Sequence, residues 1–439
     1  MRERRDLERA VDELVGLGGK LGADVIAAAY STRTAQVRFG RSEITSAGDV
    51  ETQTVQCTLA FGKRHATVSG SQLDLAALRE LAEQCARLAR VSPENPEWLP
   101  PLGPQKYATA PSGFDPATAG ARADLRAAAA GAALERGKKD GLETSGYVEQ
   151  VATRHFRATS AGMRAYHEET KAALRFTART ADGTGSGWAG AASNRVADLD
   201  AAALAEVAAG KAVRSAKPKS LPPGRYTVIL EPAAVADVLV EMTDSLSARP
   251  ADEGRSFFAK PGGGNRVGEK LFGRATLVSD PADVQAGARR WTGDGLPTPA
   301  TTWIEDGTLR ALTTSRFWAQ KTGVALRPAP DSWQLAGGKA TPEELLAGVD
   351  RGLLITRFWY IRGLDPRQLS LTGLTRDGVF LVEKGAIVGP VNNFRFNESP
   401  VNMLKNADAF GPAVVTQAGW RTPALRTHDF NFSSVSEAV

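Results

Sequence analysis

The sequence changes character at residues 217–230, KPKSLPPGRYTVIL. Three prolines and a glycine within the first eight of these residues are incompatible with a helix, because proline lacks the N–H and clashes with the preceding turn. The apolar run at 226–230 that follows is typical of a strand. We therefore expect a domain boundary here, with a C-terminal domain at residues 221–439.

Turn signals dominate the part of the chain that follows this boundary. Three short turns lie beside β-prone runs, which is the pattern of hairpins: Glu305-Asp306-Gly307, Arg376-Asp377-Gly378 and Glu383-Lys384-Gly385. We predict that residues 221–439 form a β-rich domain built on a barrel-like antiparallel sheet.

The part of the chain before the boundary alternates between helical and strand periodicity. Seven prolines at residues 92–116 mark a linker. The patterns predict the following elements: a helix at 6–21, strands at 23–69, a helix at 73–89 with Cys85 on its apolar side, a helix at 117–138, strands at 143–180 and a helix at 201–216. We therefore expect an α+β protein with two small α+β units, at residues 1–108 and 117–219, followed by the β-rich domain.

Composition limits the possible partners and the compartment. The chain has 439 residues, with 54 Lys and Arg against 49 Asp and Glu, and this small excess argues against nucleic-acid binding. Cys57 and Cys85 are the two cysteines, too few for a disulfide framework. No apolar segment is long enough to span a membrane and no export signal is visible, so we expect a cytoplasmic protein with no membrane partner.

The chain shows no catalytic motif of its own. Its four histidines, His65, His155, His167 and His428, do not have the spacing of a zinc-binding helix. The glycines at 185–190 fit G-x-G-x-x-G but open no helix, and no G-x-S-x-G is present. We expect neither a metal nor a cofactor in this chain, and no catalytic residues.

Several short stretches in the second half resemble the TldD/PmbA (TldE) peptidase family, once called modulators of DNA gyrase. They occur in the family's order: LPPGRYTVILEP at 221–232, RSFF at 255–258, SDP at 279–281, DP at 365–366, LTGLTRDG at 371–378 and VNNFRFNESP at 391–400. The strand and helix patterns at 23–89 also look like the family's N-terminal unit. The resemblance therefore extends over nearly the whole chain.

The resemblance implies a subunit that lacks the metal. In this family, TldD and TldE pair into a cytoplasmic zinc protease that acts on unfolded peptides, and only TldD carries the zinc-binding H-E-x-x-x-H helix. The matching segment here is Leu239-Val240-Glu241-Met242-Thr243-Asp244, without histidine, and no cysteine follows Cys85. We interpret Glu241 as a solvated carboxylate. The chain is thus expected to be of the TldE type and to act only together with a zinc-binding, TldD-like partner.

The best candidate for a peptide-contacting wall is Asn392, Asn393, Phe394, Arg395 and Asn397, which combine amide and guanidinium donors with aromatic bodies. An alternative stays open at this point, in which Phe394 and Phe396 fill the core and the asparagines cap turns. The aromatic run 358–360 is equally ambiguous between sheet packing and a peptide groove.

The sequence leaves three hypotheses for the function of this chain. The first is a non-catalytic TldE-like subunit that completes the substrate cleft of a heterodimeric zinc metalloprotease. The second is a stand-alone peptide-binding or regulatory homodimer without protease activity. The third is an independent metallopeptidase with unusual ligands. The residues and the resemblance favour the first.

Overall fold

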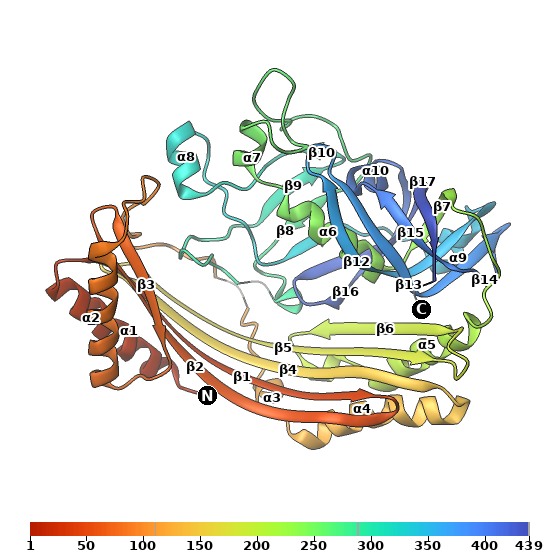
Figure 1. Cartoon of the computed structure of the whole chain (residues 1–439), viewed down its shortest axis with the longest axis horizontal. Helices are drawn as coiled ribbons and strands as arrows, with labels where there is room; N and C mark the ends of the chain where they lie inside the picture. Colours follow the sequence, from red (N-terminus) through yellow and green to blue (C-terminus); the bar gives the residue numbers. More distant parts are fainter. Residues whose placement is uncertain (110, 288, 438–439) are drawn as a thin grey trace.

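A computed structural model describes residues 1–109, 111–287 and 289–437. Within these residues the strands form two sheets, one of six strands and one of eleven. Figure 1 shows the long strands of the first sheet curving beneath and beside the second, with helices on the outer side of the curve. The α+β class and the β-rich C-terminal domain predicted from the sequence are confirmed.

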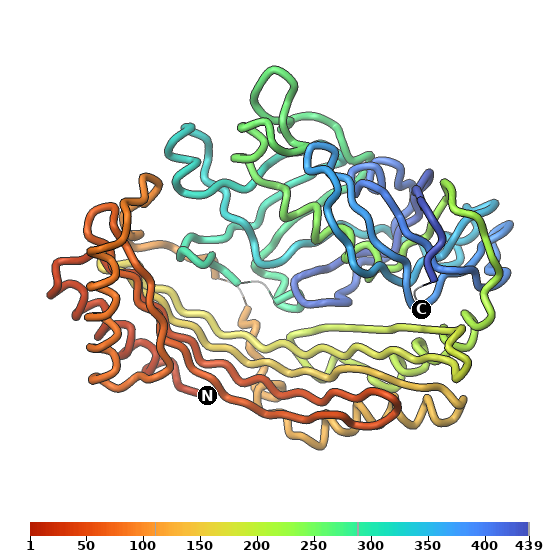
Figure 2. Tube along the Cα trace, viewed as in Figure 1, coloured from red at the N-terminus to blue at the C-terminus, as the bar shows by residue number. Residues whose placement is uncertain are grey.

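The six-stranded sheet is antiparallel throughout, in the order β3-β2-β1-β4-β5-β6. Its strands are β1 Asp24–Gly40, β2 Glu43–Phe61, β3 Arg64–Gly70, β4 Glu143–Thr159, β5 Arg164–Arg179 and β6 Ser186–Ser193. β1 pairs with β4 from Ile26 to Phe39, so strands from both predicted N-terminal units join one sheet, as Figure 2 shows. The proline-rich segment therefore separates the two predicted units along the sequence, but their strands belong to the same sheet.

Helices cover one face of this sheet. They are α1 Arg4–Lys20, α2 Leu75–Val91, the short α3 Pro116–Ala119, α4 Ala123–Asp140 and α5 Ala201–Arg214, with a 3-10 turn η1 at Val196–Asp198. Alternate residues of the strands, such as Val25, Phe39 and Phe176, pack beneath the helices because successive side chains point to opposite faces. Cys85 is fully buried on α2, which confirms its place on the apolar side. A hydrogen bond with Cys85, together with burial, raises the pKa of the Cys57 thiol.

The C-terminal sheet closes into a ring. Its strands are β7 Gly224–Leu230, β8 Leu277–Ser279, β9 Thr301–Glu305, β10 Thr308–Leu309, β11 Trp333–Leu335, β12 Arg351–Asp365, β13 Ser370–Glu383, β14 Ala386–Pro390, β15 Asn393–Glu398, β16 Ala407–Gln417 and β17 Trp420–Ser436. β7 pairs with both β12 and β17, so that β7, β12, β13, β15 and β17 form a barrel. The pairing of β7 with β12 is parallel, whereas the hairpin signals predicted antiparallel pairs.

The remaining elements surround this barrel: α6 Pro232–Asp244, α7 Ala248–Asp252, α8 Arg316–Thr322, α9 Pro342–Ala347, α10 Pro400–Lys405 and a 3-10 turn η2 at Val284–Ala286. α6 follows directly after β7 and buries Val235, Val238 and Leu239 in the barrel core. Among the residues that the structure describes, no helix is long and apolar enough to cross a membrane.

Buried polar contacts join the two sheets beside the start of α6. The ammonium group of Lys211 on α5 lies 2.5 Å from a carboxylate oxygen of Glu231, which precedes α6. The Ser186 hydroxyl on β6 donates to the Asp377 carboxylate on β13 at 2.6 Å. Because a buried charge without a partner is costly, these contacts favour one fixed arrangement of the two sheets.

The glycines at 185–190 have a packing role. A Cβ atom on Gly187 would lie 2.2 Å from the carbonyl oxygen of Ala208, and one on Gly185 would lie 2.3 Å from that of Ala212. Both carbonyls belong to α5, so the two glycines allow β6 to approach this helix closely. The G-x-G-x-x-G pattern here is therefore explained by strand–helix contact and does not require a nucleotide.

We predict that Gly187→Ala lowers the free energy of unfolding by about 2 kcal/mol, since its methyl group would overlap the backbone of α5. Gly210→Ala is the matched control, because no atom lies within 4 Å of a Cβ at that position of α5. Urea denaturation of both variants measures the effect. Equal stability of Gly187→Ala and the unmodified chain would contradict the packing explanation.

Candidate functional site

The structure places the segment that matches the zinc motif in the second half of α6. Leu239 is fully buried in the barrel core, Val240 is partly buried, and Asp244 is exposed at the helix end. Glu241 is partly exposed, and burial together with the nearby Asp244 raises its pKa, while Arg362 opposes this shift. In the described part of the chain, no three His, Cys, Asp or Glu side chains are arranged to hold a metal ion.

Asp237 is a further polar residue of α6 that the sequence analysis did not select. It lies one helical turn before Glu241, and its carboxylate accepts a hydrogen bond of 3.1 Å from the backbone N–H of Phe358. Burial raises the pKa of Asp237 to about 6, although Arg357 and Arg175 act in the opposite direction. The i, i+4 spacing of Asp237 and Glu241 on an otherwise apolar helix was the available signal. Shifted carboxyl groups of this kind are common at functional sites.

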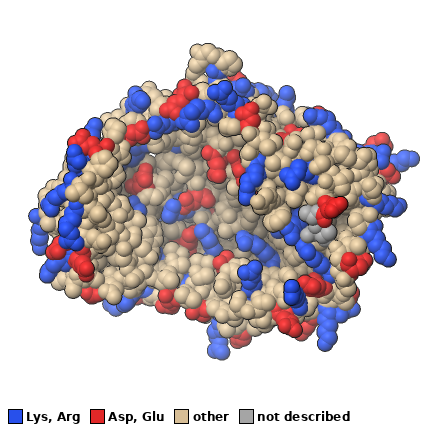
Figure 3. Space-filling model, viewed as in Figure 1, with Lys and Arg blue, Asp and Glu red and all other residues tan. Residues whose placement is uncertain are grey.

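Polar residues line the concave face of the six-stranded sheet opposite the barrel. Arg38 on β1 pairs with Tyr147 on β4, which pairs in turn with Arg175 on β5, so that the three side chains form one row. Together with Arg41 and with Arg357 of β12, they line a cleft of about 860 Å³. Figure 3 shows that the molecule is hollowed between the two sheets and that Lys and Arg as well as Asp and Glu side chains lie within and around the hollow.

The outer face of the barrel continues this surface. Trp359 of β12 pairs with Leu374 of β13, which pairs with Arg395 of β15. Arg376 of β13 places its guanidinium 4.2 Å from the centre of the Trp359 ring. Trp359 keeps 43% of its surface exposed, so an aromatic platform and several guanidinium groups are accessible on the same face.

The five residues of the predicted peptide wall divide between core and surface. Phe394 and Phe396 are buried in the barrel, whereas Arg395 and Asn397 are exposed on β15. The Asn392 side-chain oxygen accepts from the Leu221 N–H at 2.6 Å, and that of Asn393 accepts from the Thr375 hydroxyl at 3.0 Å. Both asparagines lie in a smaller pocket of about 230 Å³. Arg395 and Asn397 are thus the candidates whose side chains reach the surface.

The aromatic run at 358–360 divides in the same way. Phe358 is buried against Phe396 and Phe430, while Trp359 and Tyr360 are exposed. Tyr360 has a φ of 55°, unusual for a residue other than glycine, at the point where the β12–β13 register shifts. The irregular backbone allows two adjacent aromatic side chains to remain exposed.

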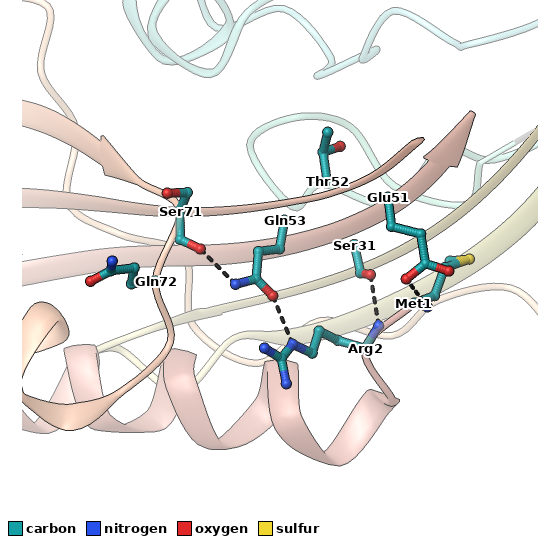
Figure 4. A pocket seen from close by; sticks show the side chains of 8 residues that line it. All are labelled: Met1, Arg2, Ser31, Glu51, Thr52, Gln53, Ser71 and Gln72. Carbon is teal, nitrogen blue, oxygen red and sulfur yellow. Dashed lines mark hydrogen bonds and ion pairs between the residues drawn. The ribbon is translucent and has the colours of Figure 1, made fainter. Parts of the chain in front are cut away.

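A second large pocket, of about 700 Å³, lies where residues 1–2 meet β1 and β2 (Figure 4). Its polar groups bind one another. The Met1 amino group lies 2.6 Å from the Glu51 carboxylate, and the Arg2 side chain donates to Gln53 at 2.7 Å. Because these groups already have partners, this pocket is a weaker candidate for a functional site than the cleft between the sheets.

The region that forms the barrel matches a known protein family. Residues 223–434 match the family described as PmbA/TldA metallopeptidase C-terminal domain. The C-terminal part of the chain belongs to this family. The family resemblance drawn from the sequence stretches between 221 and 400 is therefore confirmed.

One curated relative and several solved structures extend the comparison. A protein described as a metalloprotease from Methanothermobacter thermautotrophicus is 24% identical over 298 residues, which cover 61% of this chain and 62% of that protein. The chain thus aligns with less than two thirds of the length of this relative. TldE from Thermococcus kodakarensis has a TM-score of 0.87 at 18% identity, covering 97% of this chain and all of that one. A protein described as a modulator of DNA gyrase from Thermotoga maritima gives 0.86 at 18% identity, with the same coverage. These structures share the fold over nearly the whole chain, including the six-stranded sheet.

We predict that Asp237→Asn stabilises the fold in a pH-dependent way. The raised pKa of Asp237 means that its ionised form opposes folding once the pH exceeds its ordinary pKa of 3.8, and the cost is complete above a pH of about 6. The variant stays neutral at every pH. Its free energy of unfolding minus that of the unmodified chain should therefore be about 3 kcal/mol larger at about pH 8 than at about pH 4.

Urea denaturation at both pH values measures this difference. Asp244→Asn, which removes an exposed carboxylate from the end of the same helix, serves as the control and should change stability by less than about 0.5 kcal/mol. A stability difference for Asp237→Asn that is the same at both pH values would refute the assignment of a raised pKa.

Proposed function

We propose that this chain is a TldE-like subunit of a heterodimeric, cytoplasmic zinc metalloprotease that acts on unfolded peptides, and that it completes the substrate cleft without binding the metal. The observation that carries this proposal is the composition of α6. At the positions where the resemblance implies zinc-binding residues, Leu239 is buried and Val240 is partly buried. Glu241, which follows them, is the one carboxylate between these two residues and Asp244 at the helix end. The family match and the shared fold with TldE support it.

The proposal divides the chemistry between two chains. The zinc of a TldD-like partner would supply the activated water that attacks the peptide bond. This chain would bind and orient the peptide, and its exposed donors at Arg395 and Asn397 and the Trp359 ring are suited to an extended backbone and its side chains. Contacts of this kind depend little on the sequence of the peptide, which fits unfolded substrates.

Reconstitution tests the proposal. We expect hydrolysis of an unfolded peptide only when this chain is mixed with a TldD-like partner, with about one zinc ion per heterodimer that travels with the partner. The double variant Arg395→Ala with Asn397→Ala should lower kcat/KM of the mixture by roughly tenfold, because two donors to the peptide are lost. Arg351→Ala, an exposed arginine at the other end of β12, should leave it unchanged.

Three results would contradict the proposal. Hydrolysis by this chain alone with stoichiometric metal would indicate an independent metallopeptidase. Peptide binding by a stable homodimer, with no hydrolysis in any mixture, would indicate a stand-alone binding protein. Full activity of the partner alone would leave this chain without the proposed role.

A further inference from the structure

Four arginines around the cleft between the sheets have no ion pair with any residue that the structure describes: Arg38, Arg41, Arg175 and Arg357. Several arginines elsewhere on the same sheet and its helices do have one. Examples are Arg33 with Asp49, Arg136 with Glu206, Arg154 with Glu3 and Arg164 with Asp12. The cleft therefore concentrates positive charge that the described chain does not neutralise by direct pairing.

The lining of the cleft is suited to an anionic group. The described residues that line the cleft include no carboxylate, and they place hydroxyl groups between the arginines, from Thr45, Ser46, Ser145, Tyr147 and Thr177. Carboxylates lie close to the lining: Glu149 accepts from the Tyr147 hydroxyl at 3.2 Å, Asp237 interacts with Arg357 and Arg175, and Glu43 pairs with Gly40. The residues that line the cleft themselves carry a net positive charge, from four arginines.

The Trp188 ring and the nearby Asp237 carboxylate both act on Arg357. Its guanidinium lies 4.8 Å from the centre of the buried Trp188 ring, and its Nε atom is buried without a hydrogen-bond partner. A ring contact fixes the plane of a guanidinium and leaves its N–H edge available.

We propose that this cleft binds the carboxylate groups of acidic peptide segments, so that the chain selects peptides rich in Asp and Glu. Guanidinium and carboxylate groups match in geometry and charge, and each Arg can donate two parallel hydrogen bonds. Arg38 and Arg175 lie two strands apart, or roughly 10 Å, which suits two acidic side chains of one extended peptide better than a single small anion. The role of this selection in proteolysis rests on the proposed function, but the binding itself does not.

Peptide is favoured over nucleic acid by the surroundings of the cleft. Phosphate backbones need a continuous track of cations. Here the carboxylates of Asp237 and Glu241 on α6 lie beside Arg357 and Arg362, so the charge alternates over a short distance. Separate carboxylates on a flexible peptide can reach the arginines while avoiding α6, whereas a regular polyphosphate chain cannot.

The experiment uses the full chain without a partner. Fluorescence anisotropy measures binding of a labelled peptide of about ten residues that contains four Glu, and of the same peptide with Gln at those positions. At low salt the Glu peptide should bind roughly tenfold more tightly, and the difference should shrink as salt is added. Arg175→Gln and Arg38→Gln change exposed side chains and should each reduce the ratio to about threefold or less, whereas the control Arg351→Gln should preserve it.

Each outcome decides the proposal. Equal affinity for the Glu and Gln peptides, or a ratio that Arg175→Gln and Arg38→Gln leave intact, overturns it. Single-stranded DNA of equal charge that binds more tightly than the Glu peptide, with the same loss in both variants, assigns the cleft to nucleic acid and also overturns it. Selective binding without hydrolysis in the mixture with a partner would reject the proposed function alone, and hydrolysis without selective binding would reject this inference alone.

Discussion

The partly buried contact between Lys211 and Glu231 fixes the relation between the two halves of the molecule. Lys211 is only 6% exposed and its ammonium group lies 2.5 Å from the Glu231 carboxylate, immediately before α6. A charge buried in this way needs its partner, so α5 and the start of α6 are held together. The β6 glycines permit the close approach of strand and helix on which this contact depends. The concave face of the six-stranded sheet is thereby turned toward the barrel.

This arrangement leaves one extended polar surface available. The helices cover the other face of the six-stranded sheet, and the phenylalanines of the barrel strands fill its interior. What remains between the sheets is the cleft with Arg38, Arg175 and Arg357, continued by Trp359 and Arg395 on the barrel. A chain without histidine on α6 can still position a substrate with such a surface, since orientation and electrostatic complementarity are contributions to catalysis in their own right.

Local patterns predicted a large part of this structure. The apolar spacing of α1 and α2 and the short turns of the barrel are local signals, and the alternation in Asn393-Phe394-Arg395-Phe396-Asn397 fits the burial observed on β15. The pairing of β1 with β4 and the parallel pairing of β7 with β12 join segments more than 100 residues apart, so no local pattern could specify them. The raised pKa of Asp237 comes chiefly from burial in the folded chain, so its i, i+4 spacing from Glu241 could mark it but not show this shift.

The most direct test of a peptide-binding surface between the sheets is site-specific photo-crosslinking in the presence of a TldD-like partner. A photoreactive phenylalanine derivative in place of Trp359 would lie on the proposed surface, and the same group in place of Leu125, which is 50% exposed on α4 at the opposite face of the six-stranded sheet, would lie outside it. The account predicts that a labelled unfolded peptide crosslinks at position 359 and not at 125. Equal crosslinking at both positions, or crosslinking only at 125, would contradict it.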